Sequence, residues 1–333
     1  MTERPEAAPT IAELSEPLAA EGYGDNEFDY LERVVEIHQY EGHDYEVWTQ
    51  AEQLGLLHGA VADGEISDDE LWEIENDASN RLLNGMETEF GTDPNLADTS
   101  GDGYEDHLKW GPLRDMGLEV NPGEVDVYIE IESERGASKP TASQQQEIID
   151  LFAEEPSDDI GPINVHFHEF RTDVDPVEDR DDMAERAADR NVEGFGLHYL
   201  LITDEPYYFN GEEAGGEAWA STRGPSWMVA LDAGSRAYRT GIVAHEMGHA
   251  LGIFGGDFAG VDSTEYSADE YNSIMNYNVQ GGGDSNELTF STGEPFNDYE
   301  HMQDQEFGSF HTDTSGLERA WEAGEVPEDL LEN

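Results

Sequence analysis

The chain has no cysteine among its 333 residues, which excludes a disulfide framework and a cysteine-ligated metal. It contains no run of about 18 apolar residues, the minimum for a helix that spans a bilayer. The first ten residues, M-T-E-R-P-E-A-A-P-T, lack the basic and apolar segments of an export signal. By default we therefore expect a soluble, cytoplasmic protein.

Positive charge is scarce, because 15 Lys and Arg residues stand against 78 Asp and Glu residues, a formal net charge of −63. Only Lys109 and Lys139 are lysines. Hydrophobic residues still make up 37% of the chain, so the acids belong to the surface of a folded protein. Repulsion among them should be screened at molar salt, where the Debye length falls to about 3 Å. The composition resembles that of a salt-in halophile, such as a haloarchaeon, and it argues against nucleic acid or an anionic membrane as a partner.

Changes in composition divide the chain into three regions. Residues 1–25 are rich in Pro, Ala, Glu and Gly and predict a flexible acidic arm. Residues 26–122 form a mostly helical region, in which 28–57 has a helical spacing of apolar side chains. Pro122-Gly123 marks a boundary, so we expect the main domain to occupy 123–333.

The helical region contains two acidic loops. The segment Asp63 to Glu70 resembles the second half of an EF-hand loop, but Gly59 and Val61 offer no side-chain oxygen at its first and third positions. A plain acidic helix beginning near Ser67 is an equally good interpretation.

The second loop carries oxygen-bearing residues at alternate positions, with Gly103 at the sharp turn. This spacing is typical of a calcium loop, and the stretch resembles a thrombospondin type-3 repeat. Lys109 stands at position twelve, where a calcium loop has a bidentate carboxylate. A calcium site and a merely solvated loop both remain open. The candidate calcium ligands are Asp98, Ser100, Asp102, the carbonyl of Tyr104, and Asp106.

After the boundary, strands and helices alternate. Apolar and polar residues alternate from Val125 to Glu132, which predicts a strand buried on one face. The further elements that we expect are strands at 163–167, 195–202 and 227–231 and helices at 141–154 and 180–190. This order predicts an α/β (α+β) fold with helices packed on a sheet.

The stretch G-I-V-A-H-E-M-G-H-A-L-G, residues 241–252, contains the motif H-E-x-x-H within an apolar, helix-like segment. On a helix, His245 and His249 lie one turn apart on one face and can ligate one zinc ion. Glu246 is then placed to act as a general base. Gly252 follows where a helix often ends in a left-handed residue.

A second motif, S-I-M-N-Y at 273–277, lies about thirty residues after the first histidine. Together the two motifs resemble those of metzincin zinc peptidases, including the Met-turn. The resemblance implies a mixed, twisted sheet with an active-site helix, preceded here by a small, mostly helical domain. It also implies that Met275 forms the floor beneath the zinc and that Tyr277 contacts the metal or the oxyanion.

The third zinc ligand departs from the family pattern, since Gly255 stands where a His or Asp is expected. Asp257 is favoured by its spacing, and Asp262 is the alternative. A carboxylate is a suitable ligand for zinc in either case.

The sequence thus predicts a zinc-dependent endopeptidase adapted to high salt, in which Glu246 deprotonates a zinc-bound water that attacks the peptide bond. Its partner would be a protein or peptide substrate, paired with the strand near residues 217–220. The alternatives are a catalytically inactive zinc-holding protein and a calcium-responsive acidic binding protein. A peptidase with calcium loops would also suit an extracellular location.

Overall fold

The computed structural model describes residues 82, 84–114, 116–154, 162–190, 196–209, 212–219, 227–232, 234–280, 288–305 and 314–323. The predicted arm at 1–25, the helical pattern at 28–57 and the EF-hand-like segment at 63–70 lie outside these residues.

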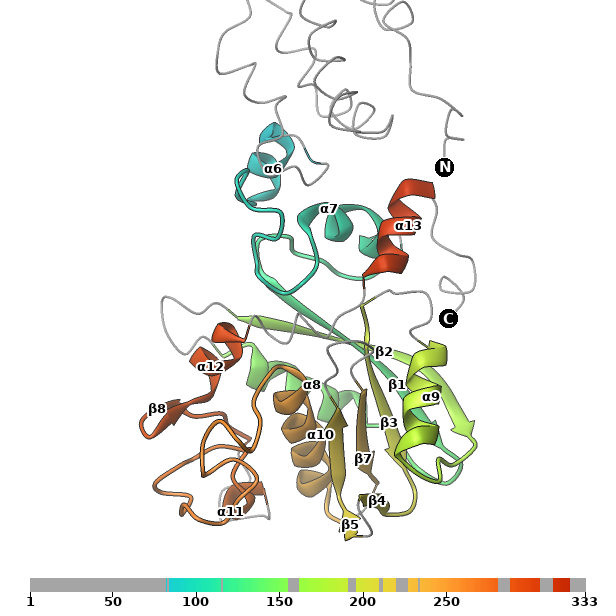
Figure 1. Ribbon diagram of the computed structural model, residues 1–333, viewed down its shortest axis with the longest axis vertical. Helices are drawn as coiled ribbons and strands as arrows, with labels where there is room; N and C mark the ends of the chain where they lie inside the picture. The colour runs from blue at the N-terminus through green and yellow to red at the C-terminus, as the bar shows by residue number, and fades with distance from the viewer. Residues whose placement is uncertain are drawn as a thin grey trace, which may run out of the picture.

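A five-stranded sheet with the order β2-β1-β3-β7-β6 forms the centre of the molecule (Figure 1). The pairs β1–β2, β1–β3 and β3–β7 are parallel, and β6 pairs antiparallel with β7 at one edge. The predicted α/β fold with a mixed sheet is confirmed. The strands are β1 (Val125–Glu134), β2 (Ile163–Val174), β3 (His198–Thr203), β6 (Gly216–Trp219) and β7 (Trp227–Leu231), with a separate hairpin of β4 (Tyr207–Phe209) and β5 (Glu212–Ala214).

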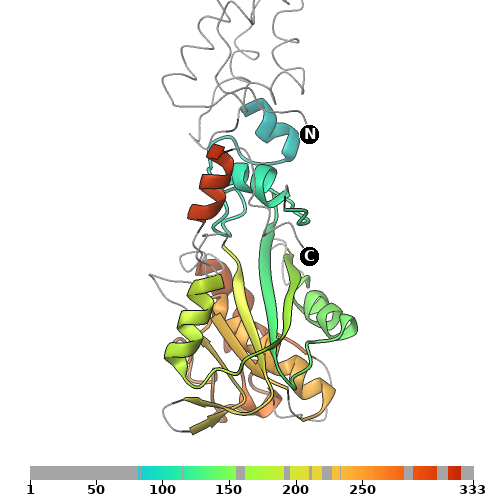
Figure 2. The same ribbon diagram turned by 90° about the vertical axis from the view of Figure 1, so that its right-hand side faces the viewer.

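Helices cover both faces of this sheet (Figures 1 and 2). The helices α8 (Ala142–Phe152) and α10 (Arg236–Ala250) pack on one face, over the main apolar core. The helix α9 (Arg180–Arg190) covers the other face through Met183 and Ala187. Each predicted helix and strand of the main domain is present, with ends within three residues of those expected, except that β2 continues to Val174, seven residues beyond the predicted 163–167.

The burial of β1 differs from the prediction, because the strand is buried on both faces rather than one. It lies between β2 and β3, and its acidic side chains find partners inside the protein. Glu132, for example, accepts hydrogen bonds from Tyr199 Oη at 2.7 Å and Arg171 Nε at 2.6 Å. Alternation of polar and apolar residues therefore did not indicate a solvent-facing side here.

A second, smaller core joins the region before β1 to the helix α13 (Ser315–Ala323), which lies beside α7 in Figure 1. Polar contacts also cross the boundary at Pro122-Gly123, since Asp102 accepts a 2.8 Å hydrogen bond from the backbone N–H of Asp126. The elements described before β1 are α6 (Asn84–Phe90), α7 (Asp106–Leu108) and the π-helical turn η1 (Lys109–Leu113).

The chain after α10 runs through irregular turns that return to the main core. Before α13, the described part of this stretch contains α11 (Tyr277–Gln280), β8 (Thr292–Gly293), β9 (Phe296–Asn297) and α12 (Asp298–Asp304). Among the helices described, none is both long and apolar enough to cross a membrane.

Candidate metal centre

The helix α10 presents both histidines of the H-E-x-x-H motif to the same point. Ser235 caps its first turn by accepting a 3.2 Å hydrogen bond from the N–H of Tyr238. The helix is buried from Thr240 to Ala250, so its direction is fixed by packing against β6 and β7. The Nε2 atoms of His245 and His249 lie 3.1 Å apart.

Asp262 completes the group. Its Oδ1 lies 3.0 Å from Nε2 of His245 and 3.2 Å from Nε2 of His249. The carboxylate arrives there because Asp262 adopts a left-handed backbone conformation, with a φ of 53°, and its N–H donates to the carbonyl of Met275. In the sequence, Asp257 was the preferred third ligand and Asp262 was the alternative. The structure brings Asp262 to the histidines.

Gly255 stands at the position where the sequence motif led us to expect a ligand side chain. A Cβ at Gly255 would lie 2.9 Å from Oδ2 of Asp262, so the absence of a side chain at Gly255 leaves room for this carboxylate in its present position. Gly252 also matters, because its φ of 108° turns the chain away from the end of α10.

Asp257, preferred on spacing, does not join the group. Its carboxylate accepts a 2.7 Å hydrogen bond from the N–H of Phe254 and lies 3.1 Å from Nε2 of His301. It therefore stabilises the turn after α10 and lies apart from the two histidines, so Asp262 is the candidate for the third ligand.

The three donor atoms fit a zinc ion. Each histidine directs Nδ1 at a backbone carbonyl, His245 at Ile274 and His249 at Ile253, which leaves the Nε2 lone pairs facing the centre. Tetrahedral ligands at about 2.0–2.1 Å from zinc lie about 3.3 Å from one another. The three separations of 3.0–3.2 Å form nearly such a triangle.

The charges of these groups are coupled. Burial alone would lower the pKa of His249, but the hydrogen bond to Asp262 and the charge of Glu246 raise it to about 9. Burial alone would raise the pKa of Asp262, but hydrogen bonds from the histidines hold it well below its ordinary value. The cluster thus stabilises a positive charge between its donors, and a divalent cation can replace the proton.

Glu246 lies beside the triangle but is not part of it. Its buried carboxylate packs against Gly216 of β6, where a Cβ would overlap it. Burial raises the pKa of Glu246 above its ordinary value, although the two histidines oppose this effect. A carboxylate with a raised pKa is suited to accept and return a proton.

Met275 lies against α10 on the inner side of the cluster. It is fully buried, and a Cβ at Gly248 would lie 2.6 Å from its Sδ. The turn that carries it is fixed by Asn276, whose side-chain amide donates to the carbonyl of Tyr271 at 2.8 Å. The predicted floor residue therefore does lie next to the helix.

Two exposed aromatic residues flank the histidines. Tyr277 is 45% exposed with its ring centroid 5.8 Å from that of His245, and Phe254 is 36% exposed at 6.2 Å from His249. Burial and the charges of Asp262 and Glu246 raise the pKa of Tyr277, so its hydroxyl stays protonated. No motif in the sequence indicates Phe254, because only the fold places it beside the site.

In the second acidic loop, the carboxylates proposed as calcium ligands accept hydrogen bonds from groups of the protein. Asp98 accepts hydrogen bonds from the N–H groups of Gly101 and Gly103, at 2.8 and 2.7 Å. Asp106 accepts hydrogen bonds from the N–H and the hydroxyl of Thr99, at 3.0 and 2.8 Å. The hydroxyl of Tyr104 donates to a distant carbonyl, that of residue 196, at 2.6 Å. Asp98 and Asp106 thus bind their own loop.

The ammonium of Lys109 takes the place of the predicted cation. Its Nζ lies 2.5 Å from Asp102 and 3.1 Å from Asp126, and it donates to Ser100 Oγ at 3.0 Å and the carbonyl of Glu124 at 2.6 Å. Lys109 and Asp102 are completely buried. Burial alone would lower the pKa of Lys109, but the two carboxylates raise it. This loop already holds a cation of its own, the ammonium of Lys109, next to two of its carboxylates.

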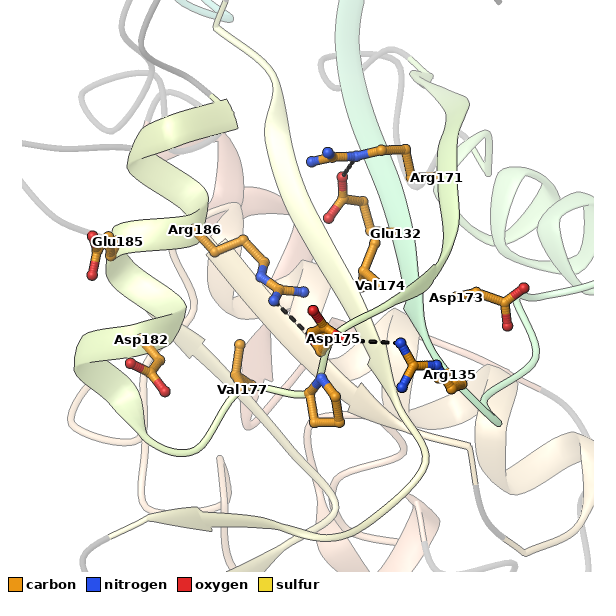
Figure 3. Close-up of a pocket in the computed structure, with 11 residues that line it drawn as sticks. Glu132, Arg135, Arg171, Asp173, Val174, Asp175, Val177, Asp182, Glu185 and Arg186 are labelled. Carbon is orange, nitrogen blue, oxygen red and sulfur yellow. Dashed lines mark hydrogen bonds and ion pairs between the residues drawn. The ribbon is translucent and has the colours of Figure 1, made fainter.

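A hollow of about 520 Å³ lies between α9 and the ends of β1 and β2, away from the histidines (Figure 3). Figure 3 shows Arg135 and Arg186 directed at Asp175 and Arg171 directed at Glu132. Two ion pairs, Arg135–Asp175 and Arg171–Glu132, lie in this hollow, and none of its lining residues belongs to the histidine group on α10.

No protein-family model matches the chain, and no curated protein matches its sequence. Among solved structures, the crystal structure of metalloproteinase-II from Bacteroides fragilis is similar, with 15% identity and a TM-score of 0.35. The match covers 54% of this chain and 52% of that one, so it spans about half the length of that protein. So distant a likeness does not assign an activity.

Proposed function

We propose that the protein is a zinc-dependent endopeptidase whose metal is held by His245, His249 and Asp262. The observation that carries this proposal is the triangle of donor atoms, 3.0–3.2 Å apart, with the carboxylate of Glu246 buried beside it. Zinc bound there would polarise a peptide carbonyl and lower the pKa of a water molecule.

In this proposal Glu246 takes a proton from the attacking water and returns it to the leaving amine. Its packing against Gly216 holds the carboxylate close to the edge strand on which a substrate would lie. Tyr277 keeps its proton and is exposed next to His245, so its hydroxyl is available to the oxyanion that develops during attack.

The substrate in this proposal is a protein or peptide in extended conformation. At one edge of the sheet, β6 pairs only with β7 among the described strands, so its other side can receive a substrate strand. The exposed rings of Phe254 and Tyr277 favour apolar side chains near the cleaved bond. The net charge of −63 leads us to propose function at high salt and disfavours nucleic acid and anionic membranes as partners.

Replacement of Glu246 tests the reaction separately from the metal. Glu246→Gln should abolish casein hydrolysis at molar salt while zinc content, measured by atomic absorption, stays at the wild-type value. Chelator should abolish the wild-type activity, and added zinc should restore it. Hydrolysis by Glu246→Gln at the wild-type rate would remove Glu246 from this role. Zinc binding by the wild type without hydrolysis of any peptide would favour the inactive zinc-holding protein.

A further inference from the structure

The edge strand β6 carries different side chains on its two faces. Gly216 and Ala218 face α10, because a Cβ at Gly216 would overlap the carboxylate of Glu246 and Ala218 packs against the main core. Side chains alternate along a strand, so Glu217 and Trp219 lie on the opposite face of the sheet, the face that carries α9 (Figure 1). The proposed function uses only the first of these faces.

On the face toward α9, Trp219 presents an aromatic surface. Trp219 is 41% exposed, and its ring stacks with that of Trp227 on β7, with ring centroids 6.4 Å apart and planes inclined by 16°. The guanidinium carbon of Arg180, the first residue of α9, lies 4.1 Å from the centre of the Trp219 ring. Arg180 also forms an ion pair with Glu217, whose side chain is only 9% exposed. These contacts fix the orientation of the indole ring beside a guanidinium whose charge is offset.

The backbone of β6 determines which substrate side chain would meet this ring. The N–H of Leu231 donates to the carbonyl of Gly215 at 2.8 Å, so these two residues form a hydrogen-bonded antiparallel pair. Such pairs alternate along a ladder, so Gly216 and Ala218 direct their N–H and C=O groups away from β7. A substrate strand that pairs with these groups places one side chain directly opposite Trp219, at the closer Cα spacing of about 4.5 Å.

We propose that Trp219, with Arg180 beside it, forms a subsite that selects an aromatic side chain of the substrate. The inference rests on the proposed peptidase function, because both use the edge of β6. Trp219 lies three positions beyond Gly216, which packs against Glu246, so the selected side chain is the third or fourth from the cleaved bond. Burial and packing of one aromatic ring against another correspond to about tenfold in affinity.

An aromatic side chain suits this surface better than a charged one. Arg180 already donates to the carboxylate of Glu217, so a substrate carboxylate would compete with a largely buried ion pair. A substrate lysine or arginine would meet the like charge of the guanidinium, which disfavours it. The subsite therefore selects by stacking rather than by charge.

Matched peptides test the subsite in the full chain at molar salt. Mass spectrometry of casein fragments locates the cleaved bonds, and one cleaved sequence is then synthesised with Phe, Ala or Glu at the third and at the fourth position on each side. At one of these positions, kcat/KM of the wild type should be about tenfold higher for the Phe peptide than for the Ala or Glu peptide.

Variants of the subsite should change this ratio of Phe to Ala peptide. In Trp219→Ala the ratio should fall to about one, and Trp219→Leu, which keeps an apolar side chain in β6, should lower it in the same way. Arg180→Lys keeps the charge beside Glu217 but loses the planar guanidinium, so its ratio should be intermediate. Leu96→Ala, at another exposed apolar residue, is the matched control and should keep the wild-type ratio.

Binding without hydrolysis separates the subsite from the proposed activity. By fluorescence anisotropy, Glu246→Gln should bind a labelled Phe peptide about tenfold more tightly than the Ala peptide, and Glu246→Gln/Trp219→Ala should bind both equally. Preferential binding by a wild type that hydrolyses no peptide would support the subsite and contradict the peptidase. Hydrolysis of the Phe, Ala and Glu peptides at equal rates, or a preference for Glu, would overturn the aromatic subsite and leave the peptidase standing. A Phe preference that survives in both Trp219 variants would likewise overturn it.

Discussion

The triangle on α10 and the loop at 98–109 both resemble metal sites in the sequence, yet they differ in where their positive charge comes from. In the loop, Lys109 is buried and brings an ammonium within 2.5 Å of Asp102. On α10, the donors are two imidazoles and one carboxylate, and no lysine or arginine is paired with Asp262 among the described ion pairs. An internal ammonium satisfies its carboxylates without a metal, so the cluster without one is the better candidate for an ion.

Removal of soluble cations should have the largest effect, because 78 Asp and Glu residues share only 15 Lys and Arg residues in this chain. At about 50 mM salt, repulsion between charges about 10 Å apart is no longer screened. We expect the chain to lose its native circular dichroism there and to regain it at molar salt. Native circular dichroism in the dilute buffer would contradict salt dependence.

Replacement of the carboxylate ligand tests the α10 side of the comparison. Asp262→Asn removes the negative charge between the two histidines, so zinc affinity and kcat/KM should fall by on the order of a thousandfold, about 4 kcal/mol. Asp257→Asn is the matched control, because Asp257 contacts Phe254 and His301 instead. Zinc affinity is measured by chelator competition. An equal loss of zinc affinity in the two variants would contradict the assignment of Asp262 as the third ligand.

Replacement of the internal cation tests the loop side. Lys109→Met leaves Asp102 and Asp126 buried without their ammonium and should lower the free energy of unfolding by about 3–5 kcal/mol. Lys139→Met, at the partly exposed second lysine, should change it by about 0.5 kcal/mol or less in urea unfolding. Indistinguishable values for the two would show that Lys109 is not the cation of this loop.

Reversal of the charge at Lys109 tests whether its ammonium occupies the position of a calcium ion. Lys109→Glu restores the carboxylate of a calcium loop at position twelve, so calcium should raise the Tm of this variant. The wild type should show no such shift, because its ammonium occupies the place of the ion. A wild-type Tm that rises with calcium would reinstate the calcium site.

The parts of the two sites that could be predicted are those set by local geometry. His245 and His249 share one face because they lie in one helix, whatever that helix packs against. Asp262 could not be chosen over Asp257, since its position depends on a left-handed backbone and on the space that Gly255 leaves. Both features follow from the packing of a turn, which spacing does not encode.

In the loop at 98–109, too, contacts with residues outside the loop could not be predicted from the sequence. The missing carboxylate at Lys109 was visible in the sequence, but two of the groups around its ammonium, Asp126 and the carbonyl of Glu124, come from beyond the predicted boundary at Pro122-Gly123. The double burial of β1 was likewise invisible, because alternation of side chains does not reveal a strand's position within a sheet.

The smallest predicted effect concerns substrate choice at the α10 site. Phe254 lies beside His249 with a third of its surface exposed, so Phe254→Ala should remove apolar contact with the substrate but no metal ligand. We expect kcat/KM to fall about tenfold for peptides with bulky apolar residues near the cleaved bond, about 1.4 kcal/mol, and to change little for small ones. Leu96→Ala is the matched control, because Leu96 is 47% exposed in the acidic loop region. Zinc content should be unchanged in both variants, and an equal fall for all peptides would mean that Phe254 supports the metal centre rather than selecting substrates.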